Sequence, residues 1–316
     1  MIVRLLALVA LLTATAASDV LTLTLATTGV DSPTCGDIEE PCKTLNHTLV
    51  LAQRRTSQAD SFEVVLLRGV YSGKHNTDIS LISSCRTCRM ITIRSDEIPV
   101  RQRRDQFESR APDLPAEAPS VQDVTIKCDS DATPHLAFLL NNVTVAFEGI
   151  EFLGCKRHAM HALNSDIEIR ACSFVNNLAA PPQGGVDPLY GGAIFASGGW
   201  LRVLQTGFES NSAPNGGAVA IQHAESTRAE FVDCKFHRNQ INAQALAGNG
   251  GAVHIESTHA INPPSSAGLF RPRLYPTGAF FDSDSSGAFQ TVAVGSSLEQ
   301  FELLEQLEQR RHRSFA

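Results

Sequence analysis

One motif occurs three times between Cys172 and Ile255 and constrains the fold more than any other feature of the chain. Each copy has a cysteine or threonine, a phenylalanine two residues later, an asparagine three residues after that, and then a Gly-Gly-Ala-aliphatic quartet. The copies contain Phe174, Asn177, Gly191 and Gly192; Phe208, Asn211, Gly216 and Gly217; and Phe236, Asn239, Gly250 and Gly251. The phenylalanines are 34 and then 28 residues apart, a period typical of a solenoid.

The residue types in this motif predict a parallel β-helix. In such a fold each coil lies on the previous one at a spacing of about 4.8 Å, so equivalent side chains stack in columns. Stacked phenylalanines fill the interior, and asparagines at a corner hydrogen-bond the turn and tolerate the left-handed conformation. The paired glycines supply a positive φ and allow close approach of the backbone. Long faces of 3.6-residue period, which helical repeats would need, are lacking in this stretch.

The N-terminus predicts export. Arg4 precedes an apolar run from Leu5 to Leu12, and a small-residue cleavage site follows at residues 14–16, so we interpret residues 1–17 as a secretory signal peptide. No later apolar run is long enough for a transmembrane segment. The net charge of -7 and the lack of a basic stripe give no reason to expect nucleic-acid binding. We therefore expect a secreted or extracellular surface protein.

Four further regions follow the signal peptide. Residues 18–58 should hold a strand over Val20–Ala26 and an amphipathic helix over Lys43–Arg54; that helix either caps the first coil or belongs to a disulfide-stapled loop. Residues 59–260 should form the β-helix. Phe152, 22 residues before Phe174, should lie in an earlier coil that shares the phenylalanine column. Residues 261–296 are a Pro/Ser/Gly-rich connector in which the repeat has ended. Residues 297–316 predict a short C-terminal amphipathic helix followed by a basic tail. This helix either caps the last coil, pairs with a helix of a partner, or is foreign sequence.

Within the β-helix, residues 96–122 are rich in proline, glutamate and arginine and poor in apolar residues. We expect a solvated, disordered insertion at one corner. Its sequence from Arg101 to Arg104 has the form of a dibasic processing site, although a charged exposed loop explains the same residues.

Eight cysteines in an exported chain favour disulfides over metal ligands. We expect bridges between Cys35 and Cys42 and between Cys85 and Cys88. A third pair, Cys128 with Cys155, would join adjacent coils. Cys172 and Cys234 share a column but lie two coils apart, about 9.6 Å, which exceeds disulfide reach, so both should be buried free thiols.

Other candidate residues carry less information. Asn46 and Asn142 begin N-glycosylation sequons, which have meaning in a eukaryotic secretory route. We expect Asn46, on the helix, to be the more accessible of the two. His158 and His161 are three residues apart, but no third residue has metal-ligand spacing, so we expect no metal and no cofactor.

The Phe-x-x-Asn and Gly-Gly-Ala-Ile/Val pairing resembles the repeats of the chlamydial polymorphic outer-membrane proteins. It is also similar to secreted pectin-lyase-like right-handed β-helix proteins. The Cys35 to Cys42 opening and the Gly69-Val-Tyr71 segment look like the start of such proteins. This resemblance implies a right-handed parallel β-helix. It implies no single activity, because the fold carries lyases, hydrolases and adhesins.

We interpret the chain as a non-catalytic recognition or adhesion module that binds an extracellular glycan or a surface protein. The motifs of polygalacturonases are missing from the sequence, although acids on successive coils could still assemble a catalytic site. Three acids, or an arginine with acids, within about 10 Å on one flank would favour a polysaccharide lyase or glycoside hydrolase. A structural matrix component is a third interpretation. The longer corners, above all residues 177–191, are the expected recognition surface, and the oligomeric state is open.

Overall fold

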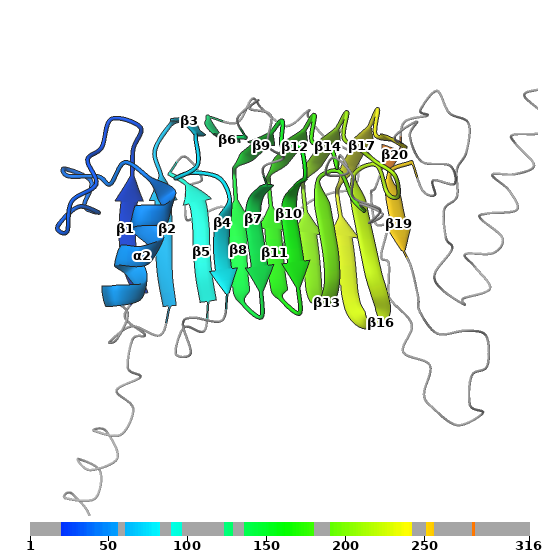
Figure 1. Ribbon diagram of the computed structural model, residues 1–316, viewed down its shortest axis with the longest axis horizontal. Coiled ribbons are helices and arrows are strands. Elements are labelled where there is room, and N and C mark those ends of the chain that lie inside the picture. Colours follow the sequence, from blue (N-terminus) through cyan, green and yellow to red (C-terminus); the bar gives the residue numbers. More distant parts are fainter. Residues whose placement is uncertain are drawn as a thin grey trace, which may run out of the picture.

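A computed structural model describes residues 20–55, 61–82, 90–96, 123–128, 136–179, 190–241, 251–255 and 280–281. The predicted signal peptide, the Cys85 to Cys88 segment, the C-terminal tail and nearly all of the insertion and connector lie outside these residues. The described chain is mostly parallel β-structure with one helix, in curled sheets whose strands form a long row (Figure 1).

The largest sheet has two sections, which we call the long and the short section. The long section contains β1 (Val20–Leu25), β2 (Ser61–Leu66), β5 (Met90–Ser95), β8 (Thr144–Glu148), β11 (Asp166–Arg170) and the second halves of β13 (Ile194–Leu204) and β16 (Val219–Val232). The short section contains β4 (Ile79–Ile82), β7 (Leu136–Asn141), β10 (His158–Leu163), the first halves of β13 and β16, and β19 (Val253–Ile255).

A second sheet contains β3 (Gly69–Ser72), β6 (Val124–Lys127), β9 (Glu151–Leu153), β12 (Ser173–Val175), β14 (Gly207–Glu209), β17 (Lys235–His237) and β20 (Phe280–Phe281). A third pairs β15 (Ser212–Ala213) with β18 (Gln240–Ile241). All of these pairings are parallel, and the chain visits the short section, the long section and the second sheet in turn.

The predicted column of phenylalanines is confirmed. Phe152, Phe174, Phe208 and Phe236 pair in register across β9, β12, β14 and β17. Their rings stack nearly parallel, with centroids 4.9, 5.1 and 4.7 Å apart, and all four are buried. Tyr71 and Ile126 continue the same register toward the N-terminus.

The asparagines of the motif form a buried hydrogen-bonded ladder. The Nδ2 of Asn177 donates to Phe152 O and to Asn211 Oδ1, both at 3.0 Å. Asn211 repeats the arrangement, donating to Phe174 O and to Asn239 Oδ1 at 2.9 Å. The backbone N–H groups of Asn177 and Asn211 also donate to the Oδ1 of the next asparagine, so the side-chain amides of these two residues are satisfied without water.

The left-handed backbone conformation that we expected at the asparagines of the motif occurs at other residues. Positive φ values occur one position earlier, at Asn176, Ser210 and Arg238, each between 52° and 54°. The asparagine that follows can then point inward, because the turn is made by the residue before it. The N–H groups of Asn176 and Ser210 donate to the next coil at Glu209 O and His237 O.

In the first two copies of the motif, the paired glycines meet both expectations. The first glycine of each pair has a positive φ, 64° at Gly191 and 63° at Gly216. The second glycine of these two pairs has no room for a side chain, since a Cβ on Gly217 would overlap Gly251 O and the backbone of Gln240. Gly250 lies outside the described residues.

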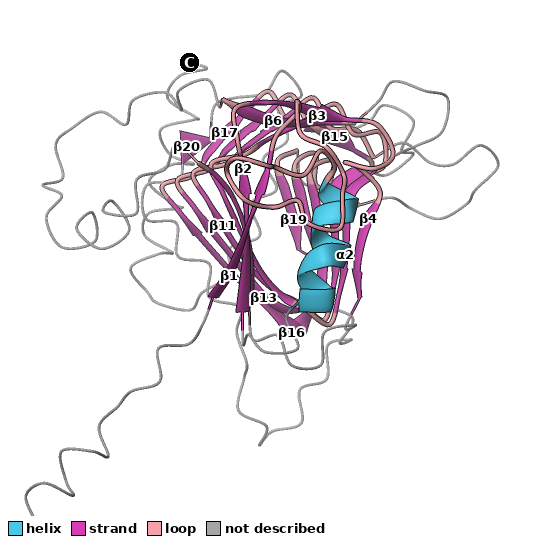
Figure 2. Ribbon diagram, turned by 90° about the vertical axis from the view of Figure 1, so that its left-hand side faces the viewer, coloured by secondary structure: helices cyan, strands magenta, loops and turns pink. Residues whose placement is uncertain are grey.

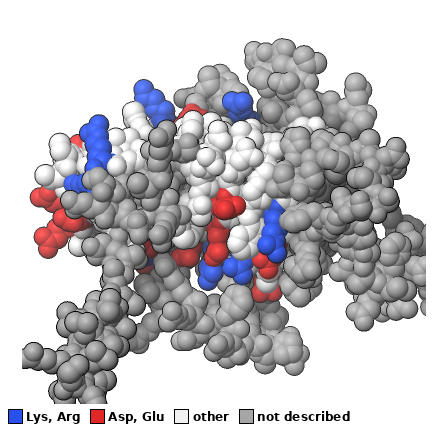
Figure 3. Space-filling model, turned by 90° about the horizontal axis from the view of Figure 1, so that it is seen from below, with Lys and Arg blue, Asp and Glu red and all other residues white. Residues whose placement is uncertain are grey.

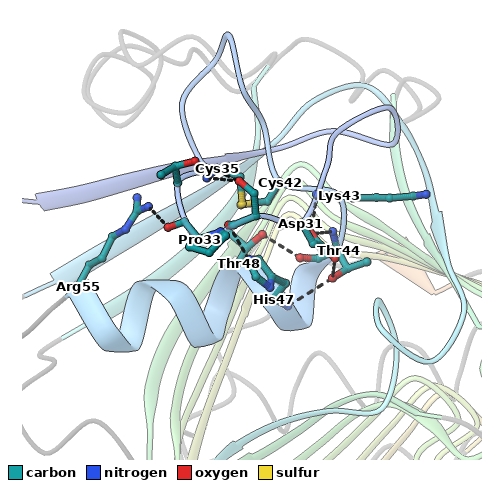
Figure 4. Close-up of a disulfide and its surroundings, with 11 residues drawn as sticks. Asp31, Pro33, Cys35, Cys42, Lys43, Thr44, His47, Thr48 and Arg55 are labelled. Carbon is teal, nitrogen blue, oxygen red and sulfur yellow. Dashed lines mark hydrogen bonds between the residues drawn. A yellow bond between two sulfur atoms is a disulfide. The ribbon is translucent and has the colours of Figure 1, made fainter.

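At the N-terminal end, helix α2 (Leu45–Arg55) lies across the opening between the long and short sections (Figure 2). Its buried side chains Leu45, Leu49 and Ala52 face the interior, and the helix contacts β1 and β2. The disulfide between Cys35 and Cys42 secures the loop before it (Figure 4). Of the two alternatives left open by the sequence, the helix therefore caps the row of strands, which keeps water from the apolar core at that end.

One detail corrects the sequence interpretation. Strand β20 lies in the predicted connector and pairs with β17, with Phe281 in register with Phe236. The strand pairing thus continues beyond Ile255, where we expected the repeat to end. The sequence did not reveal this strand because a longer connection separates it from the last copy of the motif.

Substituting Gly217 with alanine should destabilise the protein by about 2 kcal/mol or more, because the new Cβ would overlap the backbone of the next coil. Gly251→Ala is the matched control, since among the described residues a Cβ there would have only Asn239 O near it, at 3.9 Å. Urea unfolding measures both. Equal stability of the two variants would contradict the close backbone packing at Gly217.

Candidate functional site

The outer face of the long section is the candidate site. Along a strand, successive side chains point to opposite faces, so Ile167 and Ile169 lie in the core while Asp166, Glu168 and Arg170 point outward. Parallel register then aligns outward residues of β11, β13 and β16 into rows. One row is Glu168, Arg202, Glu230, and another is Asp166, Trp200, Arg228.

The first row is a chain of ion pairs. Arg202 reaches Glu168 at 3.4 Å and Glu230 at 3.2 Å, and Arg170 reaches the other oxygen of Glu168 at 2.8 Å. These side chains are about a quarter exposed, so water screens the pairs only partly. Seen from below, acidic and basic side chains lie next to one another on the described surface (Figure 3).

The second row centres on Trp200, the single tryptophan of the chain. Its side chain is 38% exposed. The guanidinium carbons of Arg202 and Arg228 lie 5.9 and 5.7 Å from its ring centre, within the range of cation–π attraction. A partly exposed indole thus has two positive charges beside its ring.

A glycine pair places Trp200 at this position. Gly198 and Gly199 have φ of 78° and 82°, and the register between β13 and β16 shifts here. Gly198 N donates to the buried Thr227 hydroxyl at 2.7 Å, which holds the bend. The backbone N–H of Trp200 donates to Asp166 Oδ1 at 3.0 Å. The sequence did not predict this site because the Gly198-Gly199 pair, whose bend places Trp200, belongs to no copy of the repeated motif.

This arrangement suits recognition of sugars or of acidic groups. A flat aromatic ring with an apolar face and a polar edge can pack against a sugar ring or an apolar side chain. Arginines beside it can hydrogen-bond carboxylates in a fixed, forked geometry. The criterion set for an enzyme is also met, since two arginines and two acids meet at contact distance on one flank.

A second group of rings lies on the short section. His158 Nδ1 is hydrogen-bonded to Gly191 O at 2.9 Å, and the ring centroids of His158 and His161 are 5.4 Å apart. The Phe195 ring is 4.8 Å from His161 and 6.0 Å from Tyr190. Burial lowers the pKa of His158 to about 3; the Gly191 bond opposes this, and the charges of His161 and Arg157 add to it. Burial and Arg157 lower the pKa of His161 to about 4.

In the described part of the chain, the one group of side chains with metal-ligand proximity is Cys35, Cys42 and His47. The two sulfurs form a disulfide, and His47 Nε2 is hydrogen-bonded to Ser32 O at 2.9 Å. These donors are therefore engaged in the cap rather than presented to an ion (Figure 4).

The cysteine predictions agree with the structure wherever they fall on described residues. Disulfides join Cys35 to Cys42 and Cys128 to Cys155, while Cys172 and Cys234 are buried free thiols. Burial raises the pKa of both thiols to about 12, so neither is a reactive nucleophile. The predicted bridge between Cys85 and Cys88 lies outside the described residues.

The glycosylation sequons differ from expectation in accessibility. Asn46 is exposed, but Thr48 of its sequon is fully buried and donates to Thr44 O at 2.8 Å. Asn142 and Thr144 are both exposed, at a turn where Asn142 has a φ of 56°. Both asparagines are thus exposed, so exposure does not rank Asn46 above Asn142 as we expected. Glycosylation at either asparagine stays a prediction.

Comparison with protein-family profiles, with curated proteins and with solved structures gave no match. In the part of the chain that the structure describes, every helix is too short or too polar to cross a membrane.

Acid should destabilise the fold through His158. The unfolded chain protonates this residue near pH 6.5 and the folded chain near pH 3, so stability present above pH 6.5 falls as the pH drops toward 3. The loss attributable to His158 should be roughly 2 kcal/mol at pH 5. Urea unfolding of wild type and His158→Gln at pH 7 and pH 5 measures it; the same pH dependence in both would contradict the burial of a neutral imidazole.

Proposed function

We propose that this chain is a secreted or cell-surface recognition module built as a right-handed parallel β-helix. The parallel register, the stacked phenylalanines and the asparagine ladder support this architecture. The two disulfides support an oxidising compartment, and the apolar N-terminal segment supports export. The repeats' resemblance to pectin-lyase-like proteins and chlamydial outer-membrane protein repeats leads to the same proposal.

The observation that carries the recognition role is the proximity of Arg202 and Arg228 to the partly exposed ring of Trp200. A half-exposed tryptophan costs hydrophobic stabilisation unless a ligand covers it, and tryptophan with arginine is the composition typical of binding hot spots. The ligand is an extracellular glycan with acidic groups or an acidic protein surface. The sugar or side chain packs on the indole, and its carboxylate or sulfate meets the guanidinium groups.

Catalysis is the alternative, and the Glu168, Arg202, Glu230 row is the observation in its favour. A polysaccharide lyase needs a basic residue beside a uronate, and a hydrolase needs two carboxyl groups flanking the bond. We favour binding because each of these carboxylates already contacts an arginine, which suits a stable surface row better than proton transfer.

Trp200→Ala should weaken binding to glycans at least tenfold without changing the melting temperature, because the removed ring provides the packing surface. Met90→Ala is the matched control: Met90 lies on the outer face of the same section and is equally exposed, at 38%. A glycan array of acidic and neutral saccharides, followed by titration of the hits, measures both variants. Equal binding by Trp200→Ala and wild type would overturn the proposed face.

A uronate-release assay on polygalacturonate separates the two functions. We expect no increase in absorbance from unsaturated product. Product formation that Glu168→Gln abolishes would replace the recognition proposal with the lyase alternative.

A further inference from the structure

A pocket of about 370 Å³ lies between the N-terminal cap and the turn after β3. Thr27, Lys43 and Thr44 line it on the side of the cap, and the segment from Val70 to Asn76 lines it on the other. Its volume falls in the range of small-molecule sites in proteins. This pocket is separate from the Trp200 face, which lies on a different sheet.

Hydrogen bonds hold both walls in place. The buried Asn76 accepts from Leu45 N at 2.8 Å and donates to Ser72 O at 2.9 Å, which joins the turn to the start of α2. Asn46 N donates to His75 O at 2.9 Å. Tyr71 forms part of the base, with its hydroxyl bonded to Leu25 O at 3.0 Å and Leu67 O at 2.6 Å. The pocket is therefore preformed.

Two lysines give the pocket positive charge. Lys43 and Lys74 are exposed, and within the described part of the chain neither ammonium pairs with a carboxylate. The acid near them, Asp31, accepts from Lys43 N at 2.8 Å and from the backbone and hydroxyl of Thr44. The Lys43 side chain points away from Asp31 (Figure 4). Its charge is therefore available to a ligand.

We propose that this pocket is an oxyanion site that takes a carboxylate or sulfate group, carried by a sugar-sized molecule or free in solution. The lysine ammonium groups neutralise the anion, and the exposed hydroxyls of Thr27 and Ser72 are further donors. The exposed Val70 and the lysine stems give the apolar surface on which a sugar ring packs. The site is independent of the proposed function of the Trp200 face.

Calorimetric titration of the full chain at low ionic strength tests the site, with sodium galacturonate, sodium sulfate and neutral galactose as probes. The double variant Lys43→Ala/Lys74→Ala should bind galacturonate at least about tenfold more weakly than wild type, because two charge-assisted contacts are lost. Lys235→Ala is the matched control. Lys235 lies on β17 of the same sheet, five strands from β3, or about 24 Å at about 4.8 Å per strand.

Unchanged galacturonate binding by Lys235→Ala, with loss in the double variant, supports the pocket. Tighter binding of galacturonate than of sulfate identifies the sugar acid as the ligand, and equal binding identifies a free anion. Galactose binding as tight as galacturonate, or equal galacturonate binding by the double variant and wild type, would overturn the site. Weakening by Lys235→Ala to the same extent would also overturn it, since only net charge would then matter.

Discussion

The buried ladder of Asn177, Asn211 and Asn239 is the interaction on which the rest of the structure depends. A buried amide is costly unless every donor and acceptor is satisfied. Here the side chains of Asn177 and Asn211 each donate to a backbone carbonyl of the preceding repeat and to the amide oxygen of the next asparagine. Those bonds form only in one register of the coils. The same register stacks the phenylalanines and leaves room for glycine alone where neighbouring backbones meet. Toward the N-terminus the ladder ends at Cys155, whose N–H donates to Asn177 Oδ1 and whose disulfide to Cys128 joins the next coil covalently.

The outer surface follows from this interior register. Once the parallel strands are aligned, residues with no repeated motif come together in rows across β11, β13 and β16. Glu168 meets Arg202, and Trp200 meets Arg228, although 34 and 28 residues respectively separate the partners in sequence. The interior repeat is therefore a scaffold that tolerates change on its outside. Both proposed binding sites use this property, one on the flat face of the long section and one where the cap joins the second sheet.

The sequence predicts the interior well and the surface poorly. Phe174, Asn211 and Gly217 could be assigned their places because a repeated residue in a stacked fold must meet its own copies. The positive φ at Ser210 rather than Asn211 could not be assigned, since the corner residue varies between copies. Trp200 and the Glu168 row were missed because their meeting depends on the bend at Gly198 and Gly199 and on the alignment of unlike residues. The pocket at Lys43 and Lys74 was missed for the same reason: its walls join two regions that no motif relates.

Hydrogen exchange of the asparagine side-chain amides tests the central claim most directly. Nuclear magnetic resonance resolves the Nδ2 protons of Asn177, Asn211 and Asn239 once each is assigned by substitution. The ladder predicts that the Nδ2 protons of Asn177 and Asn211 exchange only when the whole fold opens, orders of magnitude more slowly than those of the exposed Asn46. Exchange of Asn211 as fast as that of Asn46 would contradict the ladder and the register built on it.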